Sequence, residues 1–479
     1  MLQNNNKADL IRLFAEDPDR ARRFSATAGG WRLDLSRIPL TGTDRAQFSR
    51  QLEQVDLSAA VQRLFNGEIV NPSENRPALH MQLRSDSAPE PVAKARDAFL
   101  ESAERMHSGT SGLSDLLHIG IGGSDLGPRL VSEALDTAHS KVRVHWLSTL
   151  DARRFERLLQ ALDPERTGVV IASKSFSTEE TLTQAMAVRD WLGERFEAQS
   201  WAATASPERA LAFGLRAEHV LAFPEWTGGR FSLWSSVGVS AAALIGRFRF
   251  ERLLAGASLA DDHFRDQRGL EGLVFGLALM MHFLRRELDL STLGVISYEP
   301  RLALLGDYLQ QLVMESLGKG VDLAGQPLKT PTCPLIFGGR GTDLQHSIFQ
   351  ALHQGQDTHP LMLVGSLEQD GPFPDWQRAQ LSHLLAQARA FTQGRQDGAA
   401  HQRMPGQRPT SLLMTEHLTP EGLGYLLASF EHAVYVLSVL WGINPFDQWG
   451  VEEGKRLATA IRRRLDEQMP DLDGLADFI

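Results

Sequence analysis

The segment HIGIGGSDLG, residues 118–127, most constrains the fold, because an apolar run ends directly in two glycines and a serine. Residues 116–121 are predicted to form a buried strand, and a helix is predicted to begin at Asp125. Gly123 and Ser124 therefore occupy a strand-to-helix turn, where free backbone N–H groups bind anions. The alternative is a tight structural turn of an α/β fold without a ligand.

The same turn disfavours a nucleotide as the bound anion. A dinucleotide-binding turn would have a third glycine where Asp125 stands, and a P-loop would have a lysine followed by serine or threonine. A smaller anion, such as a phosphate monoester, fits the residues better.

Apolar runs alternate with helical patterns along much of the chain, which is typical of parallel sheets covered by helices on both faces. The predicted helices between them include residues 178–194, 300–316 and 373–392. Two groups of strands, at about 95–245 and 290–415, predict two doubly wound α/β domains. The predicted strands are residues 116–121, 142–147, 169–172, 293–297, 333–337, 361–365 and 411–414.

The expected domain limits follow from this grouping. Residues 1–94 are expected to be a mostly helical part of the larger domain, because they contain no strand run of comparable strength. Residues 95–249 are expected to form the small domain and residues 250–445 the large one. Residues 446–479 are expected to form a C-terminal helical arm.

Composition excludes several classes of protein. The net charge of −10 disfavours a nucleic-acid partner, and no stretch of about twenty apolar residues predicts a membrane span. No apolar run follows a basic start at the N-terminus, so we expect a protein that is not exported, and the single cysteine, Cys333, rules out an internal disulfide. We therefore expect a cytoplasmic protein in which a local cluster of positive groups attracts any anionic ligand.

A second candidate anion site is SKSFSTEET, residues 173–181, directly after a predicted strand. Ser173, Ser175 and Thr178 supply hydroxyl groups around Lys174, and many donors at short reach suit a compact dianion. The alternative is that the serines and threonine only cap the helix that follows.

Two further segments carry candidates for chemistry rather than anchoring. Arg230 follows paired glycines and could stabilise negative charge that develops in a substrate, or could be a surface arginine beside a turn. Glu315 lies beside the apolar stripe of a predicted helix, with Gln311 four residues earlier on the same face. Partial desolvation there favours Glu315 as a general base, and exposure to water at the helix end is the alternative.

Histidines and a lysine complete the set of candidates. His346 and His353 are seven residues apart, which is too far for a metal pair on one helix, so no metal is expected. A satisfied core histidine is the default for His353 and, less strongly, for His346. Gln448 and Lys455 lie two turns apart on one predicted helix, where Lys455 could also be a solvated surface lysine.

Taken together, these segments resemble the phosphoglucose isomerases. IGIGGSDLGP, SKSFSTEET, GGRFSLWSSVG, QQLVMESLGKG, GTDLQHSIFQALHQG and INPFDQWGVEEGK occur in the order of the corresponding family segments, and GEIVNPSENRPALHMQLR is also similar. The resemblance implies two sugar-isomerase (SIS) α/β/α sandwich domains, an obligate homodimer, and the glycolytic and gluconeogenic conversion of D-glucose 6-phosphate to D-fructose 6-phosphate. It implies no metal and no organic cofactor.

The resemblance also assigns roles by motif position. Gly123 and the hydroxyl groups around Lys174 would hold the phosphate, and Gln311 and Gln448 would hold the sugar. Glu315 would move a proton between C1 and C2 through a cis-enediol that Arg230 stabilises. His346 from the partner subunit, oriented by Glu180, and Lys455 would open the ring. The hydroxyl groups of the phosphate site would be those of Ser124, Ser173, Ser175 and Thr178.

Two differences from the family pattern concern the neighbourhood of these residues. Leu317 stands where the family usually has asparagine, and the loop before His346 contains Gly339 and Arg340 in place of an acid and a proline. Two other functions stay open: a sugar-phosphate sensor without catalysis, and an isomerase that also accepts mannose 6-phosphate. A sensor would have no use for Glu315, Arg230 and His346 together.

Overall fold

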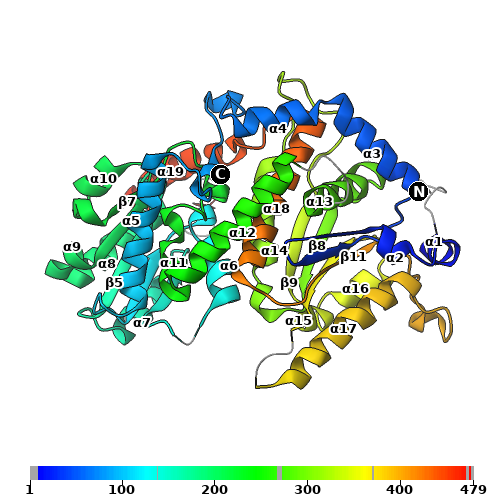
Figure 1. Cartoon of the computed structure of the whole chain (residues 1–479). Helices are drawn as coiled ribbons and strands as arrows, with labels where there is room; N and C mark the ends of the chain where they lie inside the picture. The colour runs from blue at the N-terminus through cyan, green and yellow to red at the C-terminus, as the bar shows by residue number, and fades with distance from the viewer. Residues whose placement is uncertain (1–8, 138, 267–271, 369–371, 471–473, 476–479) are drawn as a thin grey trace.

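The computed structural model of the chain describes residues 9–137, 139–266, 272–368, 372–470 and 474–475. Its named strands form two sheets, and each sheet lies between layers of helices (Figure 1). The predicted α/β fold with mostly parallel sheets is therefore confirmed.

The first sheet has five parallel strands. Successive side chains of a strand point to opposite faces, and here Leu116 and Val170 belong to one core cluster while Leu117 and Val169 belong to another. In spatial order the strands are β4 (Arg143–Leu147), β3 (Asp115–Ile119), β5 (Thr167–Ala172), β6 (Ser200–Thr204) and β7 (Val220–Ala222).

Helices cover both faces of this sheet. One face packs on α5 (Glu90–His107), α6 (Leu126–Leu135) and α11 (Val239–Ile245). The other packs on α7 (Ala152–Ala161), α8 (Glu179–Leu192), α9 (Phe196–Gln199) and α10 (Pro207–Ala212).

The second sheet has six strands. Four of them, β11, β10, β8 and β9, run parallel to one another. Its strands are, in order, β1 (Ser25–Ala28), β2 (Trp31–Asp34), β11 (Thr410–Thr415), β10 (Leu361–Ser366), β8 (Thr292–Ser297) and β9 (Leu335–Arg340). One face packs on α13 (Leu273–His282), α14 (Leu305–Leu317) and α18 (Pro420–Trp441). The other packs on α15 (Gly341–Gln345), α16 (Phe349–Gln354) and α17 (Pro374–Gln393).

The β1–β2 hairpin was not predicted from the sequence. Gly29 and Gly30 join the strands with φ of +58° and +81°, as a two-residue hairpin turn requires, and β2 pairs antiparallel with β11. The hairpin thus adds two strands to the second sheet. The rest of the N-terminal region is helical, as expected. Its helices are α1 (Leu10–Glu16), α2 (Arg20–Arg23), α3 (Gly42–Gln54) and α4 (Leu57–Phe65).

Two long helices cross at the centre of the molecule, between the two sheets (Figure 1). A Cβ atom on Gly424 of α18 would lie 1.9 Å from the carbonyl oxygen of Leu253 in α12 (Arg247–Asp266). A Cβ atom on Gly256 would lie 2.0 Å from the carbonyl oxygen of Glu421. The backbones therefore touch, and only glycine permits this at the two positions.

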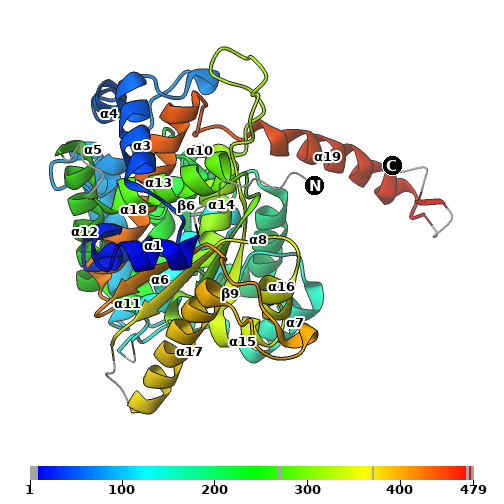
Figure 2. The same cartoon turned by 90° about the vertical axis from the view of Figure 1, so that its right-hand side faces the viewer.

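By length and composition, helix α18 could cross a membrane. However, 89% of its 18-residue apolar segment is buried inside the molecule. Core helices of soluble proteins share this property. By contrast, α19 (Glu452–Glu467) buries none of its residues and runs away from the body as an arm (Figure 2).

All seven predicted strands are present as β3, β4, β5, β8, β9, β10 and β11, each within a few residues of its expected limits. Strands β6 and β7, like β1 and β2, were not predicted from the sequence. The predicted helix over 300–316 begins as a short 3₁₀ turn, Pro300–Leu302, before α14. The domain limits given above remain a prediction.

Candidate active site

The turn after β3 is shaped by glycines that allow a close approach. Gly122 has φ +58°, and a Cβ atom on Gly123 would lie 2.0 Å from the carbonyl oxygen of Gly229. The anion-binding turn and the segment of Arg230 are thus in direct backbone contact. His118 of β3 holds the turn in place, because its Nε2 donates to the carbonyl oxygen of Ser124 at 2.7 Å. Burial lowers the pKa of His118 to about 4 and keeps the ring neutral at pH 7.

The turn after β5 carries the hydroxyl cluster. The hydroxyl groups of Ser173 and Thr178 lie 3.2 Å apart, and Thr178 makes no capping hydrogen bond to α8 although it occupies the cap position. The explanation that this threonine only caps the helix is therefore disfavoured. Phe176 is buried in a left-handed conformation, with φ +45°, at the tip of the turn.

Lys174 is the positive charge of this turn. Burial, together with repulsion from Arg76, lowers the pKa of Lys174 to about 8. The ammonium group is therefore mostly charged at pH 7 and would gain from an anionic partner.

Sheet topology brings the two turns together. β3 and β5 are adjacent parallel strands, with Ile119 opposite Ile171, so both turns leave the same edge of the sheet. Ligands of parallel sheets bind beyond the carboxyl ends of the strands. Both turns line one pocket of about 840 Å³.

Arg230 lies at the inner wall of this pocket and is 4% exposed. Its Nη1 donates to Glu315 Oε2 at 3.1 Å and to Gln448 Oε1 at 2.9 Å, and its Nε donates to Ser316 Oγ at 2.7 Å. Burial lowers the pKa of Arg230, but the group remains protonated at any physiological pH. The alternative of a surface arginine is wrong.

Glu315 and Gln311 reach the pocket from α14, a helix of the other sheet's layer. Gln311 Nε2 donates to Glu315 Oε1 at 3.2 Å, so the two residues share one helix face as expected. The side chain of Glu315 is 30% exposed and holds one oxygen on Arg230 and the other on Gln311. Glu315 is thus both fixed and accessible from the pocket.

The C-terminal segment closes the pocket on a third side. Gln448 lies just before the 3₁₀ turn Trp449–Val451 rather than within the expected helix, and Lys455 lies in the first turns of α19. Lys455 Nζ donates to Glu452 Oε1 at 2.8 Å, and its side chain is 68% exposed. Both residues line the pocket.

One pocket therefore gathers every predicted site residue except His346. The predicted residues in its wall are Gly123, Ser124, Ser173, Lys174, Ser175, Thr178, Glu180, Arg230, Gln311, Glu315, Gln448 and Lys455. His346 is exposed at the end of α15, outside the pocket of its own chain. His353 is a packed histidine that bonds Gln387 at 2.8 Å and stacks on Phe391.

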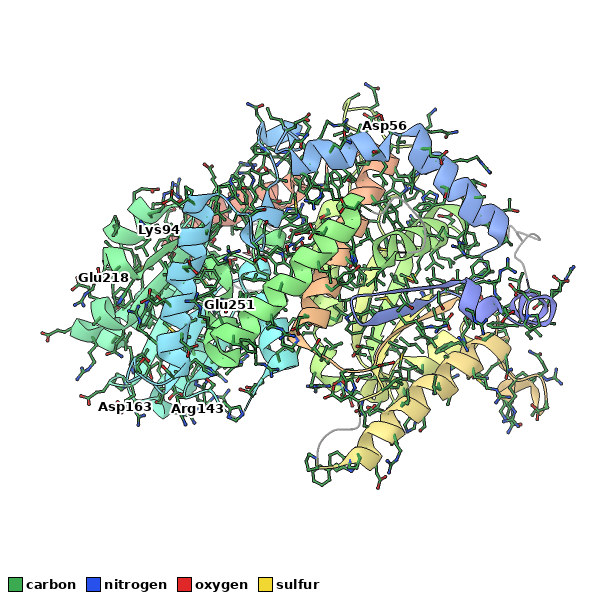
Figure 3. All side chains as sticks on the ribbon, viewed as in Figure 1. Asp56, Lys94, Arg143, Asp163, Glu218 and Glu251 are labelled. Carbon is green, nitrogen blue, oxygen red and sulfur yellow. The ribbon has the colours of Figure 1, made fainter. Side chains whose placement is uncertain are left out.

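The charge balance of the pocket differs from that of the chain as a whole. Four basic and four acidic residues line it, although the chain as a whole carries a net charge of −10. Labelled charged side chains such as Lys94, Asp163 and Glu218 point outward from the layers around the five-stranded sheet (Figure 3). The basic residues of the pocket are Arg76, Lys174, Arg230 and Lys455.

Sequence reasoning missed Arg76, which lines the pocket near Lys174 and bonds Glu74 and the carbonyl oxygen of Glu225. It also missed Lys319 and Asp447, which pair behind Arg230. Arg76 lies in GEIVNPSENRPALHMQLR, and the similarity of this segment to the family was the available signal. Among the described residues, no group of three or more His, Cys, Asp or Glu side chains could hold a metal ion.

The arrangement joins two chemical capabilities. One end offers hydroxyl groups, turn N–H groups and an ammonium group, which suit a phosphate dianion. The other end offers a fixed carboxylate beside a buried guanidinium, which suits removal of a proton next to a carbonyl group.

Comparison with known proteins identifies the family. Residues 34–474 match the family model described as phosphoglucose isomerase. A glucose-6-phosphate isomerase of Stenotrophomonas maltophilia is 43% identical over 469 residues, with 95% of this chain and 91% of that protein covered. One from Xanthomonas axonopodis pv. citri is 41% identical, with 97% and 94% covered.

Solved structures agree with the sequence comparison. The crystal structure of a glucose-6-phosphate isomerase from Chlamydia trachomatis superimposes with a TM-score of 0.86 at 28% identity. The match covers 99% of this chain and 96% of that one.

Proposed function

The chain belongs to the phosphoglucose isomerase family, and we propose that the pocket around Glu315 is where it interconverts D-glucose 6-phosphate and D-fructose 6-phosphate. It is an isomerase of the aldose–ketose type, with a role in glycolysis and gluconeogenesis. The observation that carries the proposal is that one pocket holds a phosphate-type cradle at one end and the Glu315–Arg230 pair at the other.

The cradle anchors the end of the sugar that does not react. Ser124, Ser173, Ser175 and Thr178 donate hydroxyl hydrogen bonds to the phosphate, and Lys174 adds a positive charge. Binding energy gained there holds C1 and C2 of the sugar against Glu315, which saves the entropy of finding that position in each turnover.

Glu315 moves the proton. It accepts the proton of C2 from the open-chain aldose while the carbonyl oxygen on C1 gains negative charge, which produces a cis-enediolate. It then delivers the proton to C1 while the hydroxyl proton on O2 passes to O1, and the carbonyl group forms at C2. Arg230, with Nη1 at 3.1 Å from the carboxylate, lies where it stabilises the enediolate charge, and Gln311 and Gln448 hold the sugar.

Ring opening precedes these steps and needs groups that move protons at the ring oxygen and the anomeric hydroxyl. We propose that Lys455 and His346 do this, with His346 supplied by a second subunit and oriented by Glu180. The exposure of His346 outside the pocket of its own chain and the exposed side chain of Lys455 in the pocket wall support this arrangement. The enzyme would then be a cytoplasmic homodimer that needs no metal or organic cofactor.

The role of Glu315 is tested by Glu315→Gln, which keeps the size of the side chain and one oxygen to accept from Arg230 but cannot accept the proton. We expect turnover of fructose 6-phosphate, in a coupled assay with EDTA present, to fall about 10²- to 10⁴-fold while the sugar phosphate still binds. Glu101→Gln, on the exposed side of α5, is the matched control and should match wild type in both assays. A fully active Glu315→Gln enzyme would show that another group is the base.

The shared site is tested by complementation. Glu315→Gln and His346→Ala chains, each nearly inactive alone, are co-expressed. Random pairing puts one intact site in roughly half of the dimers, so about a quarter of wild-type activity should return. If the mixture stays inactive, or if wild type is active as a monomer, the partner subunit does not supply His346.

A further inference from the structure

Asp447 is a buried carboxylate that no step above uses. It is 8% exposed and directly precedes Gln448 in the loop between α18 and α19. Its carboxylate accepts three hydrogen bonds, from Lys319 Nζ at 2.6 Å, Ser73 Oγ at 2.6 Å and Asn444 Nδ2 at 2.8 Å. These partners come from three separate parts of the chain.

The same residue contacts the reacting groups through its backbone. The carbonyl oxygen of Asp447 accepts from Arg230 Nη2 at 3.2 Å and from Lys319 Nζ at 2.5 Å. Arg230 also donates to the carbonyl oxygen of Pro445 and to the side chain of Gln448. The loop therefore sets the direction of the Arg230 guanidinium.

Lys319 is the reason a carboxylate is needed here. It lies four residues after Glu315, its side chain is 13% exposed, and it feels both the repulsion of Arg230 and the attraction of Glu315. A buried ammonium group without its own partner would turn to the nearest carboxylate. Asp447 and Glu315 are the carboxylates whose charges act on Lys319, so without the charge of Asp447 the attraction of Glu315 remains.

We propose that Asp447 is a positioning residue for the isomerisation: it retains Lys319, so that Glu315 stays paired with Arg230, and it fixes the loop that aims Arg230 and Gln448 at the reacting carbons. This inference rests on the proposed function. It assigns no contact between Asp447 and the substrate.

The first test is Asp447→Asn, which keeps the size of the side chain but removes its charge. We expect kcat to fall about 10- to 100-fold, because a base displaced by around 1 Å loses that much. KM should stay within about threefold, because the phosphate cradle is untouched. Binding of a phosphorylated aldonate, whose planar carboxylate resembles the enediolate, should weaken in parallel with kcat.

The second test separates positioning from a merely structural role. In the double variant Asp447→Asn with Lys319→Met the stray ammonium group is gone, and we expect kcat to recover at least severalfold over Asp447→Asn alone. Asp307→Asn, exposed on α14, is the matched control for loss of a carboxylate from this region. Unfolding midpoints are measured for every variant.

Three results would overturn the inference: wild-type kcat in Asp447→Asn, a loss of activity that only follows a loss of folded protein, or a double variant no more active than Asp447→Asn. Failure of the proposed function looks different, because wild type itself would then not convert fructose 6-phosphate. An active wild type with an unaffected Asp447→Asn leaves the proposed function standing and removes only the role of Asp447.

Discussion

Two buried arginines, Arg84 and Arg230, lie in the same large core and do opposite things with their charge. Arg84 is held by two buried carboxylates: Nε and Nη2 donate to Asp261 at 2.8 and 2.6 Å, and Nη1 donates to Glu431 at 2.5 Å. Trp234 donates to the other oxygen of Glu431 and stacks its ring against the guanidinium. None of the four residues of this cluster lines the pocket of the candidate active site.

Arg230 has one carboxylate partner, Glu315, and otherwise bonds neutral acceptors such as Ser316 and Gln448. The pKa values of the two arginines move in opposite directions. Burial opposes the charge of both, but at Arg84 the two carboxylates outweigh it and raise the pKa, whereas at Arg230 burial prevails and lowers it.

The comparison contrasts a charge that is neutralised within the core with a charge that faces the candidate active site. A guanidinium surrounded by two carboxylates has no unbalanced charge to offer a ligand, and removing it leaves buried anions behind. A guanidinium with one partner, itself 30% exposed to a pocket, can stabilise additional negative charge there. Burial alone therefore does not tell which arginine acts on a substrate.

The largest expected effect breaks the Arg84 side of the comparison. Arg84→Met leaves Asp261 and Glu431 buried without a counter-charge, so the free energy of unfolding should fall by about 3–5 kcal/mol, measured by urea denaturation. The fraction that remains folded should keep its kcat. Arg63→Met, on the exposed face of α4, is the control and should change little. Equal stability of the two variants would remove the structural role.

Arg230→Gln breaks the other side. We expect kcat to fall about 10²- to 10³-fold, because the enediolate loses its fixed positive charge, with a smaller change in the free energy of unfolding than in Arg84→Met. Steady-state kinetics and urea denaturation are measured on both variants. We expect the larger loss of stability in Arg84→Met and the larger loss of kcat in Arg230→Gln. If Arg230→Gln loses stability as Arg84→Met does and keeps its turnover, the contrast between the two arginines is wrong.

A smaller effect sharpens the comparison by titrating a pocket charge. With a pKa of about 8, Lys174 loses its proton as pH rises, while the phosphate, with a second pKa near 6, stays a dianion. KM should therefore rise about twofold from pH 7 to 8 and roughly 10- to 100-fold by pH 10, as a charge-assisted hydrogen bond is lost.

Lys174→Arg is the control for this titration, because arginine stays protonated throughout the range. Its KM should not rise with pH. A wild-type KM that is constant to pH 10 would mean that Lys174 does not bind the phosphate.

The active site was more predictable from the sequence than the structural cluster. Ser124 and Ser173 stand in strand-to-helix turns, and the chemistry of such a turn lies in consecutive residues that a sequence displays directly. Arg84 and Glu431 are 347 residues apart and share no local pattern. Only the packing of η2 (His80–Leu83), which precedes Arg84, against α18 and its neighbours brings them together.

The strands that were missed have similar physical reasons. β6 reads SWAAT, and its small residues give little apolar signal although all five are buried. β1 and β2 are only four residues long, but Gly29–Gly30 between them is a recognised hairpin signal that could have revealed them. Asp447 lies next to Gln448 in the segment INPFDQWGVEEGK, yet its partners Ser73 and Lys319 are set by tertiary contacts alone.

The pocket draws its wall from residues as far apart as Arg76 and Lys455, and Arg230 is held by the loop of residues 445–448. During synthesis, the N-terminal cradle thus emerges from the ribosome long before the residues that orient the guanidinium. The five-stranded sheet is translated by residue 222, but the six-stranded sheet waits for β11 and the orientation of Arg230 waits for residues 445–448.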